Sequence, residues 1–455
     1  MTLAARLGPL VGSGSVVAGS GMRPYLRDAT EARGVVGRAD AVVLPGSAAE
    51  VAAVVAWCYE RDVPMTPRGG GTGYAGGAVP EGGVVIALDR LRGVRSFEPL
   101  LWRAEVEAGV TTAQVRRRAR ENGVLYPPDP GAGEQSHIGG NVATNAGGPH
   151  AFKYGVTGAW VTGIEAVLAP GEIVRVGGQV RKDVAGYDLR SLLVGSEGTL
   201  GIVTAVSLRF VPAPEAALPV IACYDDVQAG CAAVQACLVS GIVPSAIEYL
   251  DEDAVEIVRG AFPGPLPAAT RFVVIAEADG TAAEAEAGQR ELAEALGEGA
   301  IEIRQATTRA DIEALWRWRE GVGLAADAAL GGKVSEDIAV PVDRLADAIA
   351  ATRDIAQRHA VRSCSWGHAG DGNLHATFLF ASDDDGARSR ALAAAEELFA
   401  AAVDLNGTVS GEHGIGLAKA GQLRRQLAPR ALELHAQLKA VFDPKGLLNP
   451  GKKAP

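Results

Sequence analysis

The feature of this sequence that most constrains its fold is a cluster of glycines between two apolar runs. The cluster reads Pro67-Arg68-Gly69-Gly70-Gly71-Thr72-Gly73-Tyr74-Ala75-Gly76-Gly77, and the apolar runs are residues 52–63 and 84–88. Glycine leaves backbone N–H groups uncovered and tolerates positive φ, so such a loop can wrap an anion such as a pyrophosphate. The alternative interpretation is a glycine-rich surface turn. The cluster therefore indicates a phosphate-binding loop around which the rest of the chain can be interpreted.

Two common nucleotide-binding motifs are excluded by the context of this loop. Gly71-x-Gly73-x-x-Gly76 matches the dinucleotide fingerprint in form, and Asp89 stands where its ribose-binding acid would be. That fingerprint needs a helix beginning at the third glycine, whereas Pro80 and Gly82-Gly83 follow here and cannot form one. The Gly-Lys-Ser/Thr of a Walker A loop is also missing. The loop is thus neither a Rossmann nor a P-loop nucleotide site.

Size and composition exclude further classes. A chain of 455 residues is too long for one core, so two or three domains are expected. Lys and Arg number 43 against 54 Asp and Glu, which argues against nucleic acid and anionic membrane surfaces as partners. The five cysteines form no CxxC pair and no iron–sulfur spacing, and they are typical of reduced thiols. No apolar stretch could span a bilayer and the N-terminus lacks a signal-peptide pattern. We expect a cytoplasmic protein, peripheral to the inner membrane only through a partner.

The periodicity of apolar residues predicts α/β or α+β layers. In the first half, helices are expected at 48–61 and 111–122, with Ser47 and Thr111 as N-caps, and strands at 84–88 and 102–107. Prolines 212, 214 and 219 indicate a boundary, after which helices and strands alternate. The elements expected there are helices at 229–240, 281–296, 309–330, 342–359 and 429–442, and a strand at 271–277.

Two further glycine blocks, Ile138–Gly148 and Gly195–Val203, follow the first. In this order the three blocks closely resemble the FAD-binding domain of the vanillyl-alcohol oxidase / p-cresol methylhydroxylase superfamily. The resemblance extends to the branch that holds the glycolate oxidase FAD subunit, D-lactate dehydrogenases and D-2-hydroxyglutarate dehydrogenase. It runs from about Val42 to Lys452, and its further matches are Lys153-Tyr154-Gly155, the segment Arg181–Leu189 and Gly411-Glu412-His413-Gly414-Ile415-Gly416.

The resemblance implies an α+β fold, with a two-lobed PCMH-type FAD-binding domain and an α+β substrate (cap) domain that has an antiparallel sheet. The expected domains are the FAD-binding domain at 1–213, with a core at about 38–213, the substrate domain with a metal site at 214–424, and a C-terminal segment at 425–455 that returns to the FAD domain. The active site is expected where the two domains meet.

The resemblance also implies which residues bind FAD. Backbone N–H groups of Arg68–Gly73 are expected at the pyrophosphate, the second block at the flavin and ribityl chain, and the third block at the adenosine. The first loop holds no His, and His137 only precedes the second block, so FAD is expected to be non-covalent. The full set of expected contacts is Pro67, Arg68, Gly69, Gly70, Gly71, Thr72, Gly73, Tyr74, Pro128, Asp129, Ile138, Gly139, Gly140, Asn141, Ala143, Thr144, Asn145, Gly147, Gly148, Glu197, Gly198, Gly201, Ile202, Val203 and Asn449.

A second candidate site lies in two glycine-framed motifs, Gly367–His375 and Gly411–Gly414. Two imidazoles and one carboxylate are a normal ligand set for a divalent ion with open positions, while hydrogen-bonded structural histidines are the alternative. The resemblance implies that His368, His375 and Glu412 are the metal ligands. Zn²⁺ is the first expectation, and Mn²⁺ or Fe²⁺ the second, because ligand type alone does not fix the metal.

The resemblance implies that the reaction is oxidation of a D-2-hydroxy acid to a 2-oxo acid. A metal bound to the hydroxyl would lower its pKa, His413 would act as general base, and the flavin would take the hydride. Arg319 matches the family's substrate-binding arginine, with adjacent Arg317 as its competitor, because a guanidinium suits a carboxylate. Lys333 is a second expected cation. The family has a lysine near this position, and its exact alignment with Lys333 is left open.

The sequence leaves the electron acceptor and several alternatives open. The chain has no NAD fingerprint and no cysteine cluster, so electrons must pass to a quinone, a cytochrome, an electron-transfer flavoprotein, an iron–sulfur partner or oxygen. One alternative is a glycolate oxidase catalytic subunit that is active only in a multi-subunit complex. Others are a metal-dependent hydrolase and a non-catalytic flavin-binding partner. The hydroxy acid itself and the oligomeric state, for which a homodimer is the default, are not determined by the sequence.

Overall fold

The structure, a computed structural model, describes residues 3–453 and divides them between two compact units. The first unit extends to Gly147, resumes at Val156–Ala213 and takes up the chain again from Glu412. The second unit consists of Gly148–Gly155 and Pro214–Gly411. The sequence predicts the last boundary near residue 424, whereas the compact units divide between Gly411 and Glu412. It also gives no indication that residues 148–155 belong with the second unit.

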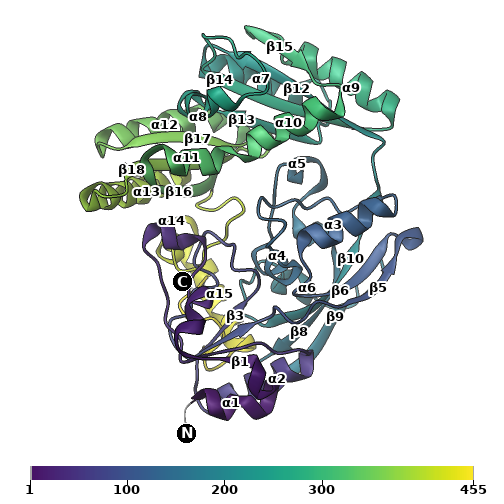
Figure 1. Ribbon diagram of the computed structural model, residues 1–455, viewed down its shortest axis with the longest axis vertical. Helices are drawn as coiled ribbons and strands as arrows, with labels where there is room; N and C mark the ends of the chain where they lie inside the picture. Colours follow the sequence, from purple (N-terminus) through teal and green to yellow (C-terminus); the bar gives the residue numbers. More distant parts are fainter. Residues whose placement is uncertain (1–2, 454–455) are drawn as a thin grey trace. The chain divides into compact units, whose positions relative to one another are not determined.

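A four-stranded sheet forms the N-terminal part of the first unit (Figure 1). Its order is β1-β2-β4-β3, with β2, β4 and β3 parallel and β1 antiparallel to β2. The predicted helix is confirmed as α2 (Ala48–Glu60), whose N-cap Ser47 accepts a hydrogen bond from the Glu50 N–H at 3.2 Å. The apolar face of α2 packs with α1 (Leu3–Val11) into the core of this sheet. The strands are β1 (Val16–Val17), β2 (Ala41–Val43), β3 (Met65–Arg68) and β4 (Val84–Ala87).

A five-stranded antiparallel sheet of order β5-β6-β10-β8-β9 completes the first unit. The predicted helix α3 (Thr112–Glu121) is confirmed and begins with a capping box between Thr111 and Gln114. The strands are β5 (Val94–Glu98), β6 (Arg103–Glu107), β8 (Val161–Leu168), β9 (Glu172–Gly177) and β10 (Ile202–Arg209), and a two-stranded ribbon pairs β7 (Val124–Leu125) with β11 (Val211–Pro212). The other helices are α4 (Ile138–Thr144), α6 (Leu189–Leu193), α14 (Leu423–Gln426) and α15 (Pro429–Phe442), the last as predicted.

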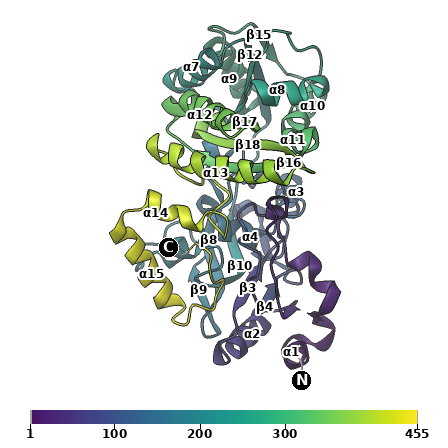
Figure 2. The same ribbon diagram turned by 90° about the vertical axis from the view of Figure 1, so that its left-hand side faces the viewer.

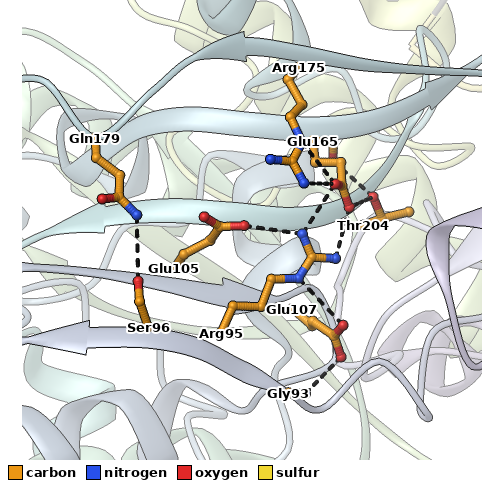
Figure 3. A network of polar contacts seen from close by, with 9 residues as sticks. All are labelled: Gly93, Arg95, Ser96, Glu105, Glu107, Glu165, Arg175, Gln179 and Thr204. Atoms are coloured by element: carbon orange, nitrogen blue, oxygen red, sulfur yellow. Dashed lines mark hydrogen bonds and ion pairs between the residues drawn. The ribbon is translucent and has the colours of Figure 1, made fainter.

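A network of charged side chains crosses one face of this sheet (Figure 3). Glu165 on β8 accepts hydrogen bonds from Arg95, Arg175 and Thr204, which come from β5, β9 and β10. Burial alone would raise the pKa of Glu165, but these donors outweigh it and hold the pKa at about 2. The carboxylate therefore stays ionised at neutral pH and ties four of the five strands together.

The second unit is built on one seven-stranded antiparallel sheet of order β15-β12-β14-β13-β17-β18-β16, which confirms the expected antiparallel sheet. Pro219 lies inside β12 rather than at a boundary, at a position just before the residues that pair with the short edge strand β15. The strands are β12 (Ala216–Tyr224), β13 (Ala246–Leu250), β14 (Phe272–Gly280), β15 (Glu302–Gln305), β16 (Gly331–Ala339), β17 (Arg362–His368) and β18 (Asn373–Ala381).

Helices cover both faces of this sheet (Figures 1 and 2). On one face lie α7 (Val227–Val239), α9 (Ala282–Ala295), α12 (Leu345–Arg358) and α13 (Asp385–Asp404). On the other, α8 (Glu252–Val258), α10 (Arg309–Glu320) and α11 (Val322–Leu330) enclose an apolar core with Trp318 and Trp366. The single helix predicted over 309–330 is wrong, because α10 and α11 are separate helices that meet at Gly321, where glycine weakens the helix.

The structure bears on two further expectations, which concern reduced cysteines and membrane-spanning segments. All five cysteines are free and buried, and burial raises the pKa of the Cys58 thiol to about 12. They are therefore small apolar core residues rather than reactive groups. Among residues 3–453, none of the helices combines the length and the apolar character that crossing a membrane requires.

Candidate active site

The three glycine blocks, distant in sequence, lie against one another in the first unit. A Cβ added to Gly69 would lie 3.3 Å from the Cα of Gly140, which joins the first block to the second. A Cβ on Gly198 would lie 2.4 Å from Pro67, which joins the third block to the first. The Glu197 N–H donates to the Ala143 carbonyl at 2.7 Å, which joins the third block to the second. Glycine suits the first two contacts, because a Cβ would crowd the Gly140 backbone in one and the Pro67 ring in the other.

The first loop has the donors that a pyrophosphate needs. Among residues 3–453, the structure gives the N–H groups of Gly69–Gly73 no hydrogen-bond partner, although these residues are half-buried. Buried N–H groups are normally paired, so five consecutive unpaired donors fit an anionic ligand. The Arg68 side chain does not serve this role, since it donates to the carbonyls of Pro24 and Arg27 at 2.9 and 2.7 Å. The residues of the loop therefore fit the diphosphate of FAD.

Several polar side chains expected at the cofactor are used inside the protein. Asn141 donates to the Thr112 hydroxyl, Thr144 to the Gly140 carbonyl, and Asn145 accepts from the Gly158 N–H. Asn449 donates to the carbonyls of Gly77 and Glu197 at 2.9 and 2.7 Å, so it fastens the C-terminal segment to the first and third blocks. Pro128 and Asp129 lie in the loop after β7, and Ile202 and Val203 are buried at the start of β10.

Enlarging one glycine of the first loop should weaken FAD binding. A Cβ at Gly70 would lie 2.1 Å from the Gln135 carbonyl oxygen and 3.2 Å from the Ser136 Cα, both backbone atoms that cannot move freely. We expect Gly70→Ala to reduce FAD affinity about tenfold or more, the scale of an overpacking penalty. Flavin absorbance per protein after desalting measures this. Gly131→Ala is the matched control, because its Cβ would meet nothing within 4 Å; equal flavin retention in both variants would contradict the expectation.

The loop that carries Glu412 and His413 is fixed within the first unit. The Glu197 carboxylate accepts the N–H groups of Ile415 and Gly416 at 2.8 and 2.7 Å. The His413 ring stacks on Tyr74 of the first glycine loop, with ring centroids 4.7 Å apart. Glu412 lies against the second block, since a Cβ on Gly147 would be 2.8 Å from its Oε2. The loop thus places the His413 imidazole next to the first glycine block and the Glu412 carboxylate next to the second.

Two histidines meet at one end of the sheet in the second unit. His368 ends β17 and His375 lies on β18, and their ring centroids are 5.3 Å apart in a T-shaped arrangement. Asp337 on β16 is paired with His375 on β18. Potential metal-binding atoms of His368 and of Asp337 each lie within 4.8 Å of one on the His375 ring. Asp337 accepts hydrogen bonds from Asn373 at 2.6 Å and Ser410 at 3.0 Å. Within the second unit, His375 therefore has two neighbours, His368 and Asp337, whose side chains are of the kind that ligates metal ions.

The two arginines that compete for the substrate role differ in environment. Arg317 is exposed, whereas the Arg319 side chain is 9% exposed and forms an ion pair with Glu248 at 2.5 Å. The Nε of Arg319 has no hydrogen-bond partner among residues 3–453, which leaves a buried donor for an anion. Lys333 donates to the Gly323 carbonyl at 2.7 Å, and burial lowers its pKa. It lies on the same face of β16 as Asp337, about 13 Å away along the strand.

Sequence reasoning missed Glu248 and Asp337. Glu248 lies in the strand Ala246–Leu250, otherwise filled with apolar and aromatic residues, and its side chain is fully buried. A carboxylate within an apolar strand is itself an indication, because a buried charge needs a partner. Asp337 stands in the polar run Ser335-Glu336-Asp337, so the sequence does not single it out, and only the pairing of β16 with β18 places it opposite His375.

Comparison with known proteins yields matches over nearly the whole chain. Residues 39–177 match the family described as FAD binding domain, and residues 213–453 match FAD linked oxidases, C-terminal domain. The glycolate oxidase subunit GlcD of Bacillus subtilis is 37% identical over 91% of this chain and 88% of its own length. The D-lactate dehydrogenase of Anaerostipes hadrus is 35% identical over 91% of this chain and 89% of its own. The structure of p-cresol methylhydroxylase superposes with a TM-score of 0.79 at 18% identity, covering 99% of this chain and 95% of that one, which shows a shared fold.

Proposed function

Because the chain belongs to the family of FAD linked oxidases and is an FAD-dependent oxidoreductase, we propose that it oxidises a D-2-hydroxy acid to the 2-oxo acid with the help of a divalent metal ion. The observation that carries the proposal is the pair of histidines His368 and His375, whose rings meet in the second unit, which also holds the buried Arg319. The relatives named glycolate oxidase and D-lactate dehydrogenase support the substrate class.

We propose His368, His375 and Glu412 as the metal ligands, with Zn²⁺ as the first candidate and Mn²⁺ or Fe²⁺ as the second. Two imidazoles and a carboxylate suit these ions and leave positions for a substrate. Asp337 is the alternative carboxylate, because it lies within ligand distance of His375 inside the same unit. Gly411 precedes Glu412, and a Cβ there would lie 2.3 Å from Asn373, so the chain needs glycine to reach Glu412 along this path.

The side chains then have distinct roles in the reaction. Bound FAD supplies a hydride acceptor, and a bound divalent ion supplies Lewis-acid polarisation of the substrate hydroxyl. His413 accepts the hydroxyl proton on an imidazole nitrogen, while stacking on Tyr74 holds the ring in place. Arg319 binds the substrate carboxylate through donors that Glu248 does not use. Electrons leave the flavin for an external acceptor.

A panel of substrates tests the reaction class. Under anaerobic conditions, glycolate or the D-isomer of lactate or 2-hydroxyglutarate should bleach the flavin absorbance of the purified protein, and the L-isomers of the two chiral acids should not. Bleaching by one acid would also identify the substrate. A metal-dependent hydrolase would give no bleaching with any acid, so a flavin that stays oxidised throughout the panel would contradict the proposal.

A second candidate is a catalytic subunit that works only within a complex. It is favoured by the Bacillus subtilis relative, whose name describes it as a subunit of glycolate oxidase. Co-purification from the native host should then bring down a second FAD-type subunit and an iron–sulfur subunit. An isolated chain that turns over with an artificial acceptor would favour independent action.

A further inference from the structure

Glu248 is a buried carboxylate that joins two of the residues assigned to the site. It lies on β13 and is paired with His368 of β17 and Ile275 of β14 in the sheet register. Its side chain is fully buried. Oε1 lies 2.6 Å from His368 Nδ1, and Oε2 lies 2.5 Å from Arg319 Nη2. An ionised carboxylate without partners would be costly here, so its two partners account for its presence.

The contact with His368 fixes which ring nitrogen can bind a metal. An ionised carboxylate only accepts hydrogen bonds, so the proton in this contact belongs to Nδ1 of His368. The neutral ring then carries its lone pair on Nε2. A carboxylate behind a ligating histidine holds the tautomer and the ring plane and raises the basicity of the ligand nitrogen. Glu248 thus has the geometry of a support for His368 as a ligand.

The second contact of Glu248 restrains the guanidinium of Arg319. Arg319 lies near the end of α10, and its side chain is 9% exposed. With Nη2 on Glu248, the planar guanidinium cannot rotate freely, and its Nε remains a buried donor without a partner among residues 3–453. A planar guanidinium group that is held at one nitrogen directs its other N–H donors toward a carboxylate in a fixed orientation.

We propose that Glu248 is the positioning residue that sets both the metal ligand His368 and the substrate-binding Arg319. The inference rests on the proposed function, since it gives these two residues the roles proposed there. A single carboxylate with one oxygen on each group couples their orientations. Loss of Glu248 therefore weakens metal binding and substrate binding together, which a buried ion pair with a purely structural role would not do.

The test compares Glu248→Gln with the wild-type holoenzyme. Zn²⁺ affinity, measured by competition with a chromogenic chelator, should fall about 10- to 100-fold, the usual effect of losing a group behind a metal ligand. KM for the hydroxy acid should rise about tenfold, the value of one hydrogen bond to a charged group. FAD content should not change. Glu248→Asp keeps the charge and should recover part of both losses.

Two variants separate this role from effects on folding. Glu277→Gln is the matched control: Glu277 is a buried carboxylate on the adjacent strand β14 and contacts a histidine, His150, outside the ligand set. It should bind Zn²⁺ within about threefold of wild type, the additivity scale of independent sites. Arg319→Met should raise KM but keep Zn²⁺ affinity. If Glu248→Gln does not fold, the double variant Glu248→Gln/Arg319→Met removes the unpaired charge and should still lose Zn²⁺ affinity.

The outcomes distinguish this inference from the proposed function. Normal Zn²⁺ affinity in a folded Glu248→Gln or double variant overturns the positioning role while leaving the metal site intact. A wild-type protein that binds none of Zn²⁺, Mn²⁺ and Fe²⁺ overturns the metal site itself. Equal losses in Glu248→Gln and Glu277→Gln would assign the effect to general destabilisation and would also overturn the inference.

Discussion

His413→Ala is expected to abolish reduction of the flavin by the hydroxy acid while FAD remains bound. His413 stacks on Tyr74 in a loop that Glu197 fixes, so the imidazole is positioned next to the first glycine loop. Removing a general base costs about 10²- to 10⁴-fold in rate. Stopped-flow measurement of flavin bleaching under anaerobic conditions gives this rate directly, and the absorbance before mixing gives FAD content.

His435→Ala is the control for this experiment, because His435 is an exposed residue of α15. It should reduce its flavin at the wild-type rate. A His413→Ala protein that carries full FAD and bleaches within threefold of wild type would remove His413 from the role of base. Loss of FAD from the variant would instead show that the stacking on Tyr74 supports the cofactor loop.

Local elements could be predicted from the sequence because their causes are local. The helices α2, α3 and α15 follow from apolar spacing and from capping residues such as Ser47 and Thr111, which act within one turn. The antiparallel sheet and the FAD-binding fold follow from the resemblance, which rests on ordered blocks of residues. The division of 309–330 at Gly321 was missed, because a single glycine interrupts some helices and is tolerated in others.

The contacts inside the site could be predicted only in part. The glycine blocks indicate close backbone approaches, and their mutual contacts agree with that interpretation, but the sequence does not say which block touches which. Glu248 and His368 are separated by 120 positions, and only the pairing of β13 with β17 brings them together. The same holds for Asp337 and His375 on β16 and β18. Strand order is a property of the whole sheet, so such partners need a structure.

The division of the chain into two units has a consequence for the flavin loops. Gly148, the last residue of the second glycine block, and residues 149–155 belong to the second unit. There His150 contacts Glu277 at 3.0 Å, Lys153 pairs with Asp279, and the Tyr154 hydroxyl donates to Asp279 at 2.5 Å. The sequence could not reveal this, because the partners Glu277 and Asp279 lie more than a hundred positions away. The chain thus links the proposed flavin loop directly to the sheet that carries the histidines.

Removal of the divalent ion is expected to abolish turnover without releasing FAD. Polarisation of a substrate oxygen by a metal is worth several kcal/mol, so activity should fall by about 10²- to 10³-fold. The loops proposed to bind FAD and the His368–His375 pair lie in different compact units, so flavin absorbance should survive dialysis against a chelator. Turnover should return with Zn²⁺ or Mn²⁺, and whichever ion restores it at the lower concentration identifies the better match.

Variants of the ligands then decide which carboxylate completes the site. His375→Ala should lose both Zn²⁺ binding and turnover, because His375 belongs to the proposed ligand set whichever carboxylate completes it. Glu412→Gln should do the same if Glu412 is the third ligand. In that case Asp337→Asn should bind Zn²⁺ almost normally, although it weakens the hydrogen bonds that Asp337 accepts from Asn373 and Ser410. The reverse pattern would replace Glu412 with Asp337. An enzyme that works at full rate after thorough chelation, and whose His375→Ala variant also turns over normally, would show that the two histidines are structural and that the oxidation proceeds without a metal.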